Sequence, residues 1–311
     1  MNRLIYLLAT LFLSLGACAQ QPQTDSRYYR PLNSKEQHVI IQKGTDLPFQ
    51  GKYDDFWKDG IYVCKQCGAP LYRSSDKFDG HCGWPSFDDA FPNAIIRRPD
   101  PDGLRTEIIC ARCGAHLGHV FLGEGFTAKN TRHCVNSTSL IFIPAHSPQN
   151  ASQDTAYFAG GCFWGVEYFL AKAPGVIKTI TGYMGGHTQR PTYEQVSSHT
   201  TGYAETVEVI FSPAKTTYEK LAKYFFEIHD PTEFNRQGPD IGDQYRSEIF
   251  YRTVDQFRIA QQLIQQLEKN DYPVVTRLNA ATPFYPAKAF HQNYYSRTGG
   301  KPYCHHFVKR F

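Results

Sequence analysis

Cys162 lies in the run Gly160-Gly161-Cys162-Phe163-Trp164-Gly165-Val166-Glu167, where its thiol is placed to react. Residues 156–159 form a short apolar run typical of a strand, and residues 163–173 have the spacing of an amphipathic helix. Cys162 is therefore expected between a glycine-rich turn and a helix N-terminus, whose partial positive charge favours the thiolate. The spacing predicts a nucleophile, and the alternative is a structural cysteine buried on a helix face.

Four further cysteines form two C-x-x-C pairs, each followed by glycine: Cys64 with Cys67, and Cys110 with Cys113. Four thiolates at this spacing suit tetrahedral zinc. One pair alone could be redox-active, but two matched pairs indicate a closed site with no open position for substrate. The spacing predicts one structural zinc ion, and a zinc-ribbon module that binds nucleic acid is the alternative.

The composition is that of a globular protein with about two domains. The chain has 311 residues, 41% of them hydrophobic and 20% charged, and this length suits two ordinary cores. Its net charge of +4 is mild and dispersed, which argues against a nucleic-acid partner. The nine cysteines are an odd number without the spacing of a secreted disulfide framework. Methionine occurs only at Met1 and Met184, which suits a protein that works where methionine is oxidised.

Two kinds of element must position these cysteines. Short β-type runs at residues 60–63, 106–109 and 140–143 predict a mainly antiparallel β domain over residues 35–144. Strands at 206–211 and 247–251 alternate with amphipathic helices at 218–227 and 254–268, which predicts a mixed α+β sheet with flanking helices over residues 155–311. Residues 145–154 are polar and aperiodic, so we expect a linker there.

The N-terminus has the pattern of an export signal. Arg3 precedes an apolar stretch at residues 4–15 that is short for a bilayer span, which predicts a signal peptide over residues 1–17. Leu15-Gly16-Ala17-Cys18 resembles the bacterial lipoprotein box, so Cys18 is expected to carry lipid and residues 18–34 to form a tether. We therefore expect a membrane-anchored protein facing the periplasm or the cell exterior. The alternative is an ordinary signal peptide with Cys18 incidental.

The run around Cys162 resembles the active-site signature of the A-type peptide methionine sulfoxide reductases, and the resemblance continues through Thr201-Gly202-Tyr203-Ala204-Glu205 and Gln244-Tyr245-Arg246-Ser247. It implies that Cys162 is the nucleophile and Glu205 the acid. It also implies a substrate site made of Phe163 and Trp164 against the methyl group, with Tyr193, Asp240 and Tyr245 around the oxygen. A carboxyl in an aromatic pocket is expected to have a raised pKa, which would keep Glu205 protonated near neutrality.

Residues 30–144 resemble the B-type methionine sulfoxide reductases, through Gly80-His81-Cys82-Gly83-Trp84-Pro85-Ser86-Phe87, His116-Leu117-Gly118-His119 and Arg132-His133-Cys134-Val135-Asn136. This resemblance implies that Cys134 is the nucleophile, Cys82 the resolving thiol and Trp84 a wall for the substrate methyl group. The polar surround it implies is His116, His119, Arg132 and Asn136. Histidines that titrate near neutrality can supply the proton that sulfoxide reduction requires. Gly80-His81 and His133 depart from common family patterns without removing a reacting group.

The two resemblances together imply a bifunctional fusion that reduces methionine sulfoxide in oxidised proteins. Each epimer needs its own enzyme, and the resemblances assign the R epimer to the N-terminal half and the S epimer to the C-terminal half. Each half would pass through a sulfenic acid and a disulfide and then need a thioredoxin-like donor. A thiol-active holdase or a zinc-ribbon binding protein with degenerate sites is the alternative.

Cys304 is the expected partner of Cys162 in that cycle. Some A-type enzymes carry a resolving cysteine shortly after Pro-Thr-Tyr, but residues 194–198 contain none here. With the other cysteines assigned, Cys304 remains, in a tail whose glycines and proline allow it to bend back. His146, His305 and His306 are expected at the surface.

Overall fold

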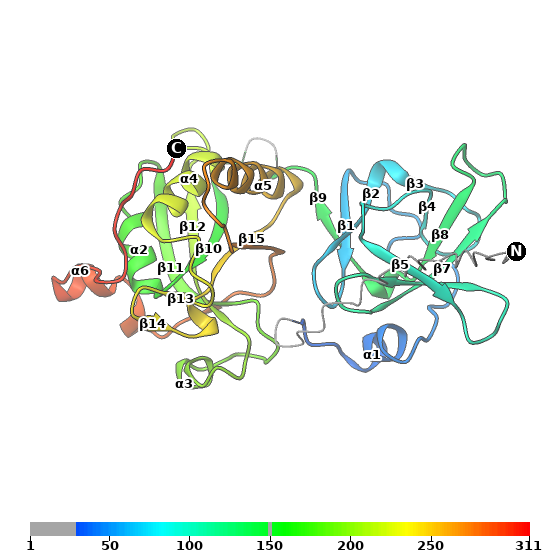
Figure 1. The fold of residues 1–311 in the computed structure, drawn as a ribbon, viewed down its shortest axis with the longest axis horizontal. Coiled ribbons are helices and arrows are strands. Elements are labelled where there is room, and N and C mark those ends of the chain that lie inside the picture. The colour runs from blue at the N-terminus through cyan, green and yellow to red at the C-terminus, as the bar shows by residue number, and fades with distance from the viewer. Residues whose placement is uncertain (1–28, 149–150) are drawn as a thin grey trace, which may run out of the picture.

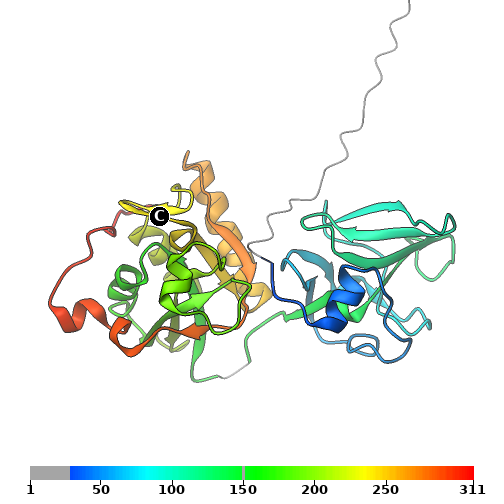
Figure 2. The ribbon, with the colours of Figure 1, turned by 90° about the horizontal axis from the view of Figure 1, so that it is seen from below.

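The computed structural model describes residues 29–148 and 151–311, which form two lobes joined through β9 and β10 (Figures 1 and 2). The predicted signal peptide, Cys18 and most of the predicted tether lie outside the described residues. Within the described ranges, no helix is both long and apolar enough to cross a bilayer.

The N-terminal domain is mainly antiparallel β, as predicted. One sheet has the order β2-β1-β9 and the other the order β3-β4-β8-β7-β6-β5. The strands are β1 (Gly60–Cys64), β2 (Pro70–Arg73), β3 (Lys77–Phe78), β4 (Ser86–Phe87), β5 (Ile95–Pro99), β6 (Thr106–Cys110), β7 (His116–Leu122), β8 (Thr131–Val135) and β9 (Leu140–Pro144). The helices are α1 (Ser34–Ile40) and the 3-10 turns η2 (Ser74–Asp76) and η3 (Ser137–Ser139).

Alternation of apolar residues along these strands builds one core between the two sheets. Tyr62, Tyr72 and Phe87 are fully buried there, and the rings of Tyr72 and Phe87 stack with centroids 4.4 Å apart. Helix α1 begins at a capping box between Asn33 and Glu36, which satisfies backbone donors at its first turn.

The C-terminal domain has a mixed sheet of order β16-β15-β10-β12-β11-β17, in which only β15 and β16 are parallel. The strands are β10 (Asp154–Gly160), β11 (Val176–Met184), β12 (Ala204–Phe211), β15 (Ser247–Tyr251), β16 (Arg277–Ala280) and β17 (Tyr285–Pro286), with a small ribbon of β13 (Arg236–Gln237) and β14 (Asp240–Ile241). The helices are α2 (Phe163–Leu170), α3 (Tyr193–Ser197), α4 (Tyr218–Ile228), α5 (Val254–Lys269) and α6 (Tyr294–Thr298), with η4 (Asp243–Tyr245) and η5 (Ala289–His291).

Helices α2 and α4 pack their apolar faces on this sheet. Val166 and Leu170 of α2 and Leu221 and Phe225 of α4 belong to the same buried cluster as Phe158 of β10. Helix α2 ends three residues before the predicted position, because the chain turns at Ala171 towards β11. Met184 ends β11 and is fully buried beside Phe250.

The two domains contact each other through apolar and polar residues. Ile61 and Ile143 of the N-terminal domain form one buried cluster with Tyr251 and Ala280 of the C-terminal domain. Arg30 donates to the carbonyl oxygen of Ala280 at 2.9 Å and hydrogen-bonds the carbonyls of the first C-x-x-C turn. Arg30, within the segment predicted as a tether, therefore contacts both domains.

Candidate functional site

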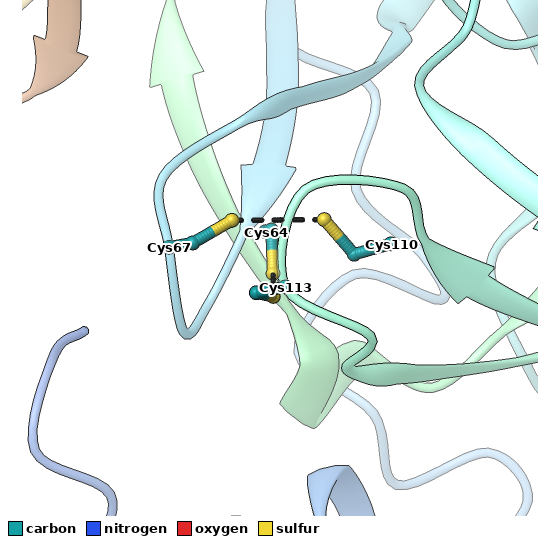
Figure 3. A group of neighbouring side chains, drawn as sticks. All are labelled: Cys64, Cys67, Cys110 and Cys113. Carbon is teal, nitrogen blue, oxygen red and sulfur yellow. Dashed lines mark hydrogen bonds between the residues drawn. The ribbon is translucent and has the colours of Figure 1, made fainter. Parts of the chain in front are cut away.

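The four predicted metal-binding cysteines converge on one point. Their sulfur atoms all lie within 4.8 Å of one another, with Cys64 3.6 Å from Cys113 and Cys67 3.6 Å from Cys110 (Figure 3). A Zn–S bond of about 2.3 Å in a tetrahedron requires sulfur atoms about 3.8 Å apart. The donor set and its dimensions therefore fit a zinc ion.

Two matched turns build this centre. Gly68 N–H donates to the carbonyl of Cys64, and Gly114 N–H to that of Cys110, both at 2.9 Å. Both glycines have left-handed φ values of 72° and 75°, which other residues adopt at a cost. Each turn follows a β-strand, so the four-cysteine cluster brings the ends of β1 and β6 together.

Cys82 and Cys134 are brought together from separate parts of the N-terminal domain. Cys134 lies on β8 with its Cα opposite Ser86 on one side and His119 on the other. The Sγ atoms of Cys82 and Cys134 are 3.9 Å apart, and both thiols are free. Only a small movement separates this arrangement from a disulfide.

The guanidinium of Arg132 lies beside this pair. It donates to the Sγ of Cys82 at 3.3 Å, and Glu124 holds it with two bonds of 2.7 and 2.8 Å. The hydrogen bond with Cys134 lowers the pKa of Cys82 to about 5. Ser86 and Arg132 lower this pKa as well, whereas burial raises it. The same bond and burial raise the pKa of Cys134. In the reduced pair the negative charge therefore lies on Cys82.

His116 and His119 are held by separate carboxylates, with their rings 5.6 Å apart. His116 is buried and its Nδ1 lies 2.7 Å from Glu107, a fully buried carboxylate that also binds Lys43 and Arg98. His119 Nε2 lies 2.7 Å from Asp100.

Burial lowers the pKa of His116, although Glu107 opposes this effect. Glu107 is itself buried, but its bonds to Arg98, His116 and Lys43 outweigh burial and lower its pKa to about 2. Ionised Glu107 keeps the proton of His116 on Nδ1. The Nε2 atom is buried and has no hydrogen-bond partner among the described residues, so its lone pair is left to accept a proton.

The other predicted residues of this site have structural contacts as well. Trp84 Nε1 donates to the carbonyl of Asp46 at 2.9 Å, and Asn136 Oδ1 accepts from the N–H of Asp46 at 2.9 Å. The Asp46 backbone thus links the two side chains. His133 contacts Arg97 and Tyr72.

In the C-terminal domain, Cys162 and Glu205 meet at the N-terminus of α2. Cys162 is the N-cap residue and is 8% exposed. Glu205, on β12, is buried and accepts the N–H of Phe163 at 3.0 Å. Burial raises the pKa of Glu205 to about 8, in the direction expected from the sequence.

The prediction that the helix terminus favours a Cys162 thiolate is wrong for this resting arrangement. Burial, followed by the neighbouring Glu205, raises the pKa of Cys162 well above its ordinary value. Loss of hydration outweighs the partial charge of a helix of eight residues. Cys162 and Glu205 are therefore both protonated near neutral pH.

Three predicted oxygen-binding residues surround this pair. Tyr193 begins α3 and Tyr245 ends η4, and both hydroxyls have their pKa raised, first by burial and then by the charge of Glu205. Asp240, on β14, accepts from the hydroxyl of Tyr303 at 2.9 Å. The structure thus brings both hydroxyls within electrostatic reach of the acid.

Aromatic rings form the other wall. Trp164 stacks on Tyr294 with centroids 3.8 Å apart, and its Nε1 donates to Nδ1 of His291 at 3.2 Å. The buried His291 ring also lies 5.2 Å from Phe163 and 4.7 Å from Tyr193. His291 was not predicted from the sequence, and it contacts three side chains that were predicted to bind substrate, those of Phe163, Trp164 and Tyr193.

Cys304 returns to this site from the C-terminal tail. Gly299 ends α6 with φ 75°, and the chain then turns back until Val308 N–H donates to Glu227 of α4. Cys304 is buried, and burial followed by Asp240 raises its pKa. The expectation that His305 lies at the surface is wrong: its ring is 4% exposed, because it fills the space beside Gly161 and Gly165.

The comparisons with known proteins match this geometry. The family model described as peptide methionine sulfoxide reductase matches residues 154–311, and the model described as SelR domain matches residues 32–144. This chain belongs to the peptide methionine sulfoxide reductases. It is a fusion of a B-type domain and an A-type domain, as its sequence implied.

Relatives of each type match one domain. Peptide methionine sulfoxide reductase MsrA of Geobacter sulfurreducens is 47% identical over 155 residues, which cover 49% of this chain and 96% of the relative. Peptide methionine sulfoxide reductase B5 of Oryza sativa subsp. japonica is 50% identical over 133 residues, which cover 42% of this chain and 98% of the relative. The reduced form of Mxr1 from Saccharomyces cerevisiae has 30% identity and a TM-score of 0.48, over 52% of this chain and 95% of that one.

The methionine sulfoxide reductase sites contain residues that sequence reasoning left without a role. Glu107 orients His116, Glu124 holds Arg132, and His291 binds Trp164. The partners of Glu107 are Lys43, Arg98 and His116, which come from three other segments. A motif read along the chain gives no signal for such contacts.

Proposed function

We propose that the B-type domain reduces the R epimer of methionine sulfoxide and the A-type domain the S epimer, each through a cysteine sulfenic acid and a disulfide. The observation that carries this proposal is the pair of separate thiol centres, each with its own proton-bearing groups. The two sites have different acid groups, histidines in one and Glu205 in the other, which suits one site for each epimer.

In the A-type domain, Glu205 donates its proton to the sulfoxide oxygen while the sulfur of Cys162 attacks the sulfoxide sulfur. The thiol proton of Cys162 passes to the Glu205 carboxylate and so restores the acid. Oxygen transfer leaves methionine and a sulfenic acid on Cys162, so the substrate sulfur is reduced and the cysteine sulfur oxidised. The buried Glu205 is protonated up to about pH 8, as a general acid must be. Tyr193 and Tyr245 stabilise the oxygen, and Phe163 and Trp164 contact the methyl group.

In the B-type domain, Cys134 is the proposed nucleophile, and either His116, once it takes up a second proton at Nε2, or His119 supplies the proton for the oxygen. The charge on Cys82 and the proton on Cys134 belong to one coupled pair. Arg132 stabilises whichever sulfur carries the charge. Cys82 then attacks the sulfenic acid of Cys134, forming a disulfide and releasing water.

The four-cysteine centre is proposed to hold zinc and to serve the fold. Four sulfur ligands close the coordination sphere, so no position remains for a substrate. Cys64 and Cys110 would hold the ion with the second cysteine of each turn. The ion would join β1 to β6 and so support the domain that carries Cys134.

Recycling is proposed to use an external dithiol. In the A-type domain, Cys304 attacks the sulfenic acid of Cys162, and a thioredoxin-like protein reduces the resulting disulfide and that of the B-type domain. Oxidised proteins are the proposed substrates. The N-terminal pattern supports an exported lipoprotein anchored through Cys18, facing the periplasm or cell exterior.

Turnover of the separate R and S epimers of N-acetylated methionine sulfoxide with dithiothreitol tests this proposal. We expect both epimers to be reduced by the metallated full-length protein. The Cys134→Ser variant should lose the R activity alone. Equal loss of both activities in that variant would contradict the division between domains.

A further inference from the structure

Cys304 and His305 form a buried thiol–imidazole pair beside the loop that carries Cys162. The Sγ of Cys304 lies 3.1 Å from Nδ1 of His305, and Nε2 of His305 lies 2.7 Å from the carbonyl oxygen of Gly160. A carbonyl oxygen can only accept, so Nε2 carries the ring proton. In the neutral ring, Nδ1 is then an acceptor that faces the thiol.

Two glycines near Cys162, Gly161 and Gly165, leave space for the imidazole of His305. A Cβ at Gly165 would lie 2.2 Å from Nδ1 of His305, and a Cβ at Gly161 would lie 3.1 Å from its Cε1. Atoms cannot approach that closely without a shift. The two glycines therefore let the His305 ring lie directly against the nucleophile turn and the first turn of α2.

The Cys304 thiol needs help to react. Burial first and then Asp240 raise its pKa, so thiolate is scarce at neutral pH, and the thiolate is the form that attacks sulfur. We propose that His305 is the general base that takes the proton of Cys304 as this thiol attacks the sulfenic acid of Cys162. This inference rests on the proposed recycling of the A-type site.

The proposed step is balanced. The S–H bond of Cys304 and the S–O bond of Cys162 break, and one S–S bond forms. The thiol proton passes to Nδ1 of His305, which later returns it to solvent, and the departing hydroxide takes up one proton to leave as water. The sulfur of Cys304 is oxidised and that of Cys162 reduced, so no other reactant is required.

Burial, more than the charges around it, keeps the His305 ring neutral and so able to accept a proton. Burial lowers the pKa of His305 to about 4. The bond to Gly160 and the charge of Asp240 raise this pKa, and the exposed His306 lowers it. His229 is a neighbouring buried imidazole with its own pKa lowered by burial to about 3. His305 is therefore neutral above about pH 5. Asp240 is the competing base, because it also interacts with the Cys304 thiol.

A single-turnover experiment on the reduced full-length protein separates the two chemical steps. One equivalent of the S epimer of N-acetylated methionine sulfoxide is added without a donor. Methionine formation reports the first step, and loss of free thiol at Cys162 and Cys304, located by peptide mapping, reports the second. His305→Gln keeps an N–H donor for the Gly160 carbonyl and removes the base. His306→Gln is the matched control on the exposed neighbour.

We expect His305→Gln to form methionine at the normal rate and to close the disulfide about 100-fold more slowly or worse, the lower end of the usual range for a lost general base. His306→Gln should do both at the normal rates. Disulfide closure at the unsubstituted rate in folded His305→Gln would overturn the inference, as would slow closure in Asp240→Asn with normal closure in His305→Gln. Absence of methionine formation in the unsubstituted protein would instead contradict the proposed function.

The pH dependence tests the same step without substitution. With His305 as base, the closure rate should stay nearly constant from pH 7 down to about pH 5. Without a base, attack would follow the thiolate fraction, which falls about tenfold per pH unit below the thiol pKa. A tenfold fall per unit in the unsubstituted protein over this range would contradict the inference.

Discussion

Arg112, between the two cysteines of the second metal-binding turn, donates to the Oδ1 of Asn279 in the other domain at 2.9 Å. Asn279 in turn donates to Glu248 at 2.6 Å, and Glu248 accepts from Arg246. Arg246 binds the carbonyls of Gly202 and Asp243, in the segments that lead to Glu205 and Tyr245. A hydrogen-bonded chain thus joins the four-cysteine cluster of one domain to the segment of the other domain that carries Glu205.

Arg112→Ala should destabilise the contact between the domains by about 1 kcal/mol, the usual net effect of losing one such bond. We expect thermal unfolding to show the C-terminal domain unfolding at a lower temperature, with metal content unchanged. Arg105→Ala is the matched control, because Arg105 pairs with Asp102 at the surface, away from this contact. Equal unfolding curves for Arg112→Ala and the unsubstituted protein would contradict the prediction.

Cys64→Ser should release the metal and destabilise the N-terminal domain, because metal binding contributes folding free energy in four-cysteine sites. Reduction of the R epimer should be lost. Reduction of the S epimer should be nearly intact at moderate temperature, since Cys162, Glu205 and Cys304 all lie in the other domain. Metal analysis, thermal unfolding and separate assays of the two epimers provide the measurements.

The nucleophiles should be separable by substitution. Cys134→Ser should abolish R-epimer reduction alone, and Cys162→Ser should abolish S-epimer reduction alone, because a serine hydroxyl is a far weaker nucleophile than a thiolate. Cys82→Ser is a necessary third variant, because the lowered pKa of Cys82 makes it the thiolate of the reduced pair. It should still reduce one equivalent of the R epimer. If Cys82→Ser fails to reduce one equivalent while Cys134→Ser succeeds, Cys82 is the nucleophile and Cys134 the resolving thiol.

Reduction of the S epimer should decline as pH rises through about 8. Glu205 must be protonated to donate, and its pKa in the folded protein is raised to about 8. Glu205→Gln should lower kcat/KM for the S epimer by about 100-fold or more, the usual effect of losing a general acid. R-epimer reduction by the same variant is the internal control and should be unchanged.

The same titration affects stability in a definite direction. The folded state binds the proton of Glu205 more tightly than the unfolded state, in which the carboxyl group has its ordinary pKa of about 4.5. The stabilisation that comes from the proton on Glu205 is therefore fully present below about pH 4.5 and is lost as pH rises through about 8. Glu205→Gln should remove this part of the pH dependence in denaturant unfolding.

Cys304→Ser should still reduce one equivalent of the S epimer, because the first chemical step does not use the second thiol. Multiple turnover with a thioredoxin-type donor should fall sharply, and a small dithiol should restore part of it by reducing the sulfenic acid directly. Peptide mapping of the oxidised unsubstituted protein should join Cys162 to Cys304. A disulfide from Cys162 to a cysteine of the first domain would contradict the assignment.

The sequence predicted those features that depend on local pattern. Strand β15 and the start of helix α5 lie where apolar periodicity placed them, and the metal cluster forms from two C-x-x-C pairs. The expected ionisation of Cys162 was wrong because it depends on burial and on Glu205, 43 positions away in the chain. His305 was misplaced for a related reason: the space it fills belongs to glycines 161 and 165, and only the tertiary fold brings the tail there.

Met184, the one methionine among the described residues, is fully enclosed beside Ala159, Ala204 and Phe250. Oxidants in solution cannot reach its sulfur, so the folded enzyme does not acquire at Met184 the lesion that it repairs in other proteins. Its vulnerability to oxidants lies in its thiols. A catalytic sulfenic acid that is oxidised again before its partner thiol closes on it becomes sulfinic acid, which a dithiol donor does not reverse. The speed of disulfide closure thus sets the number of turnovers that each molecule completes before it is lost.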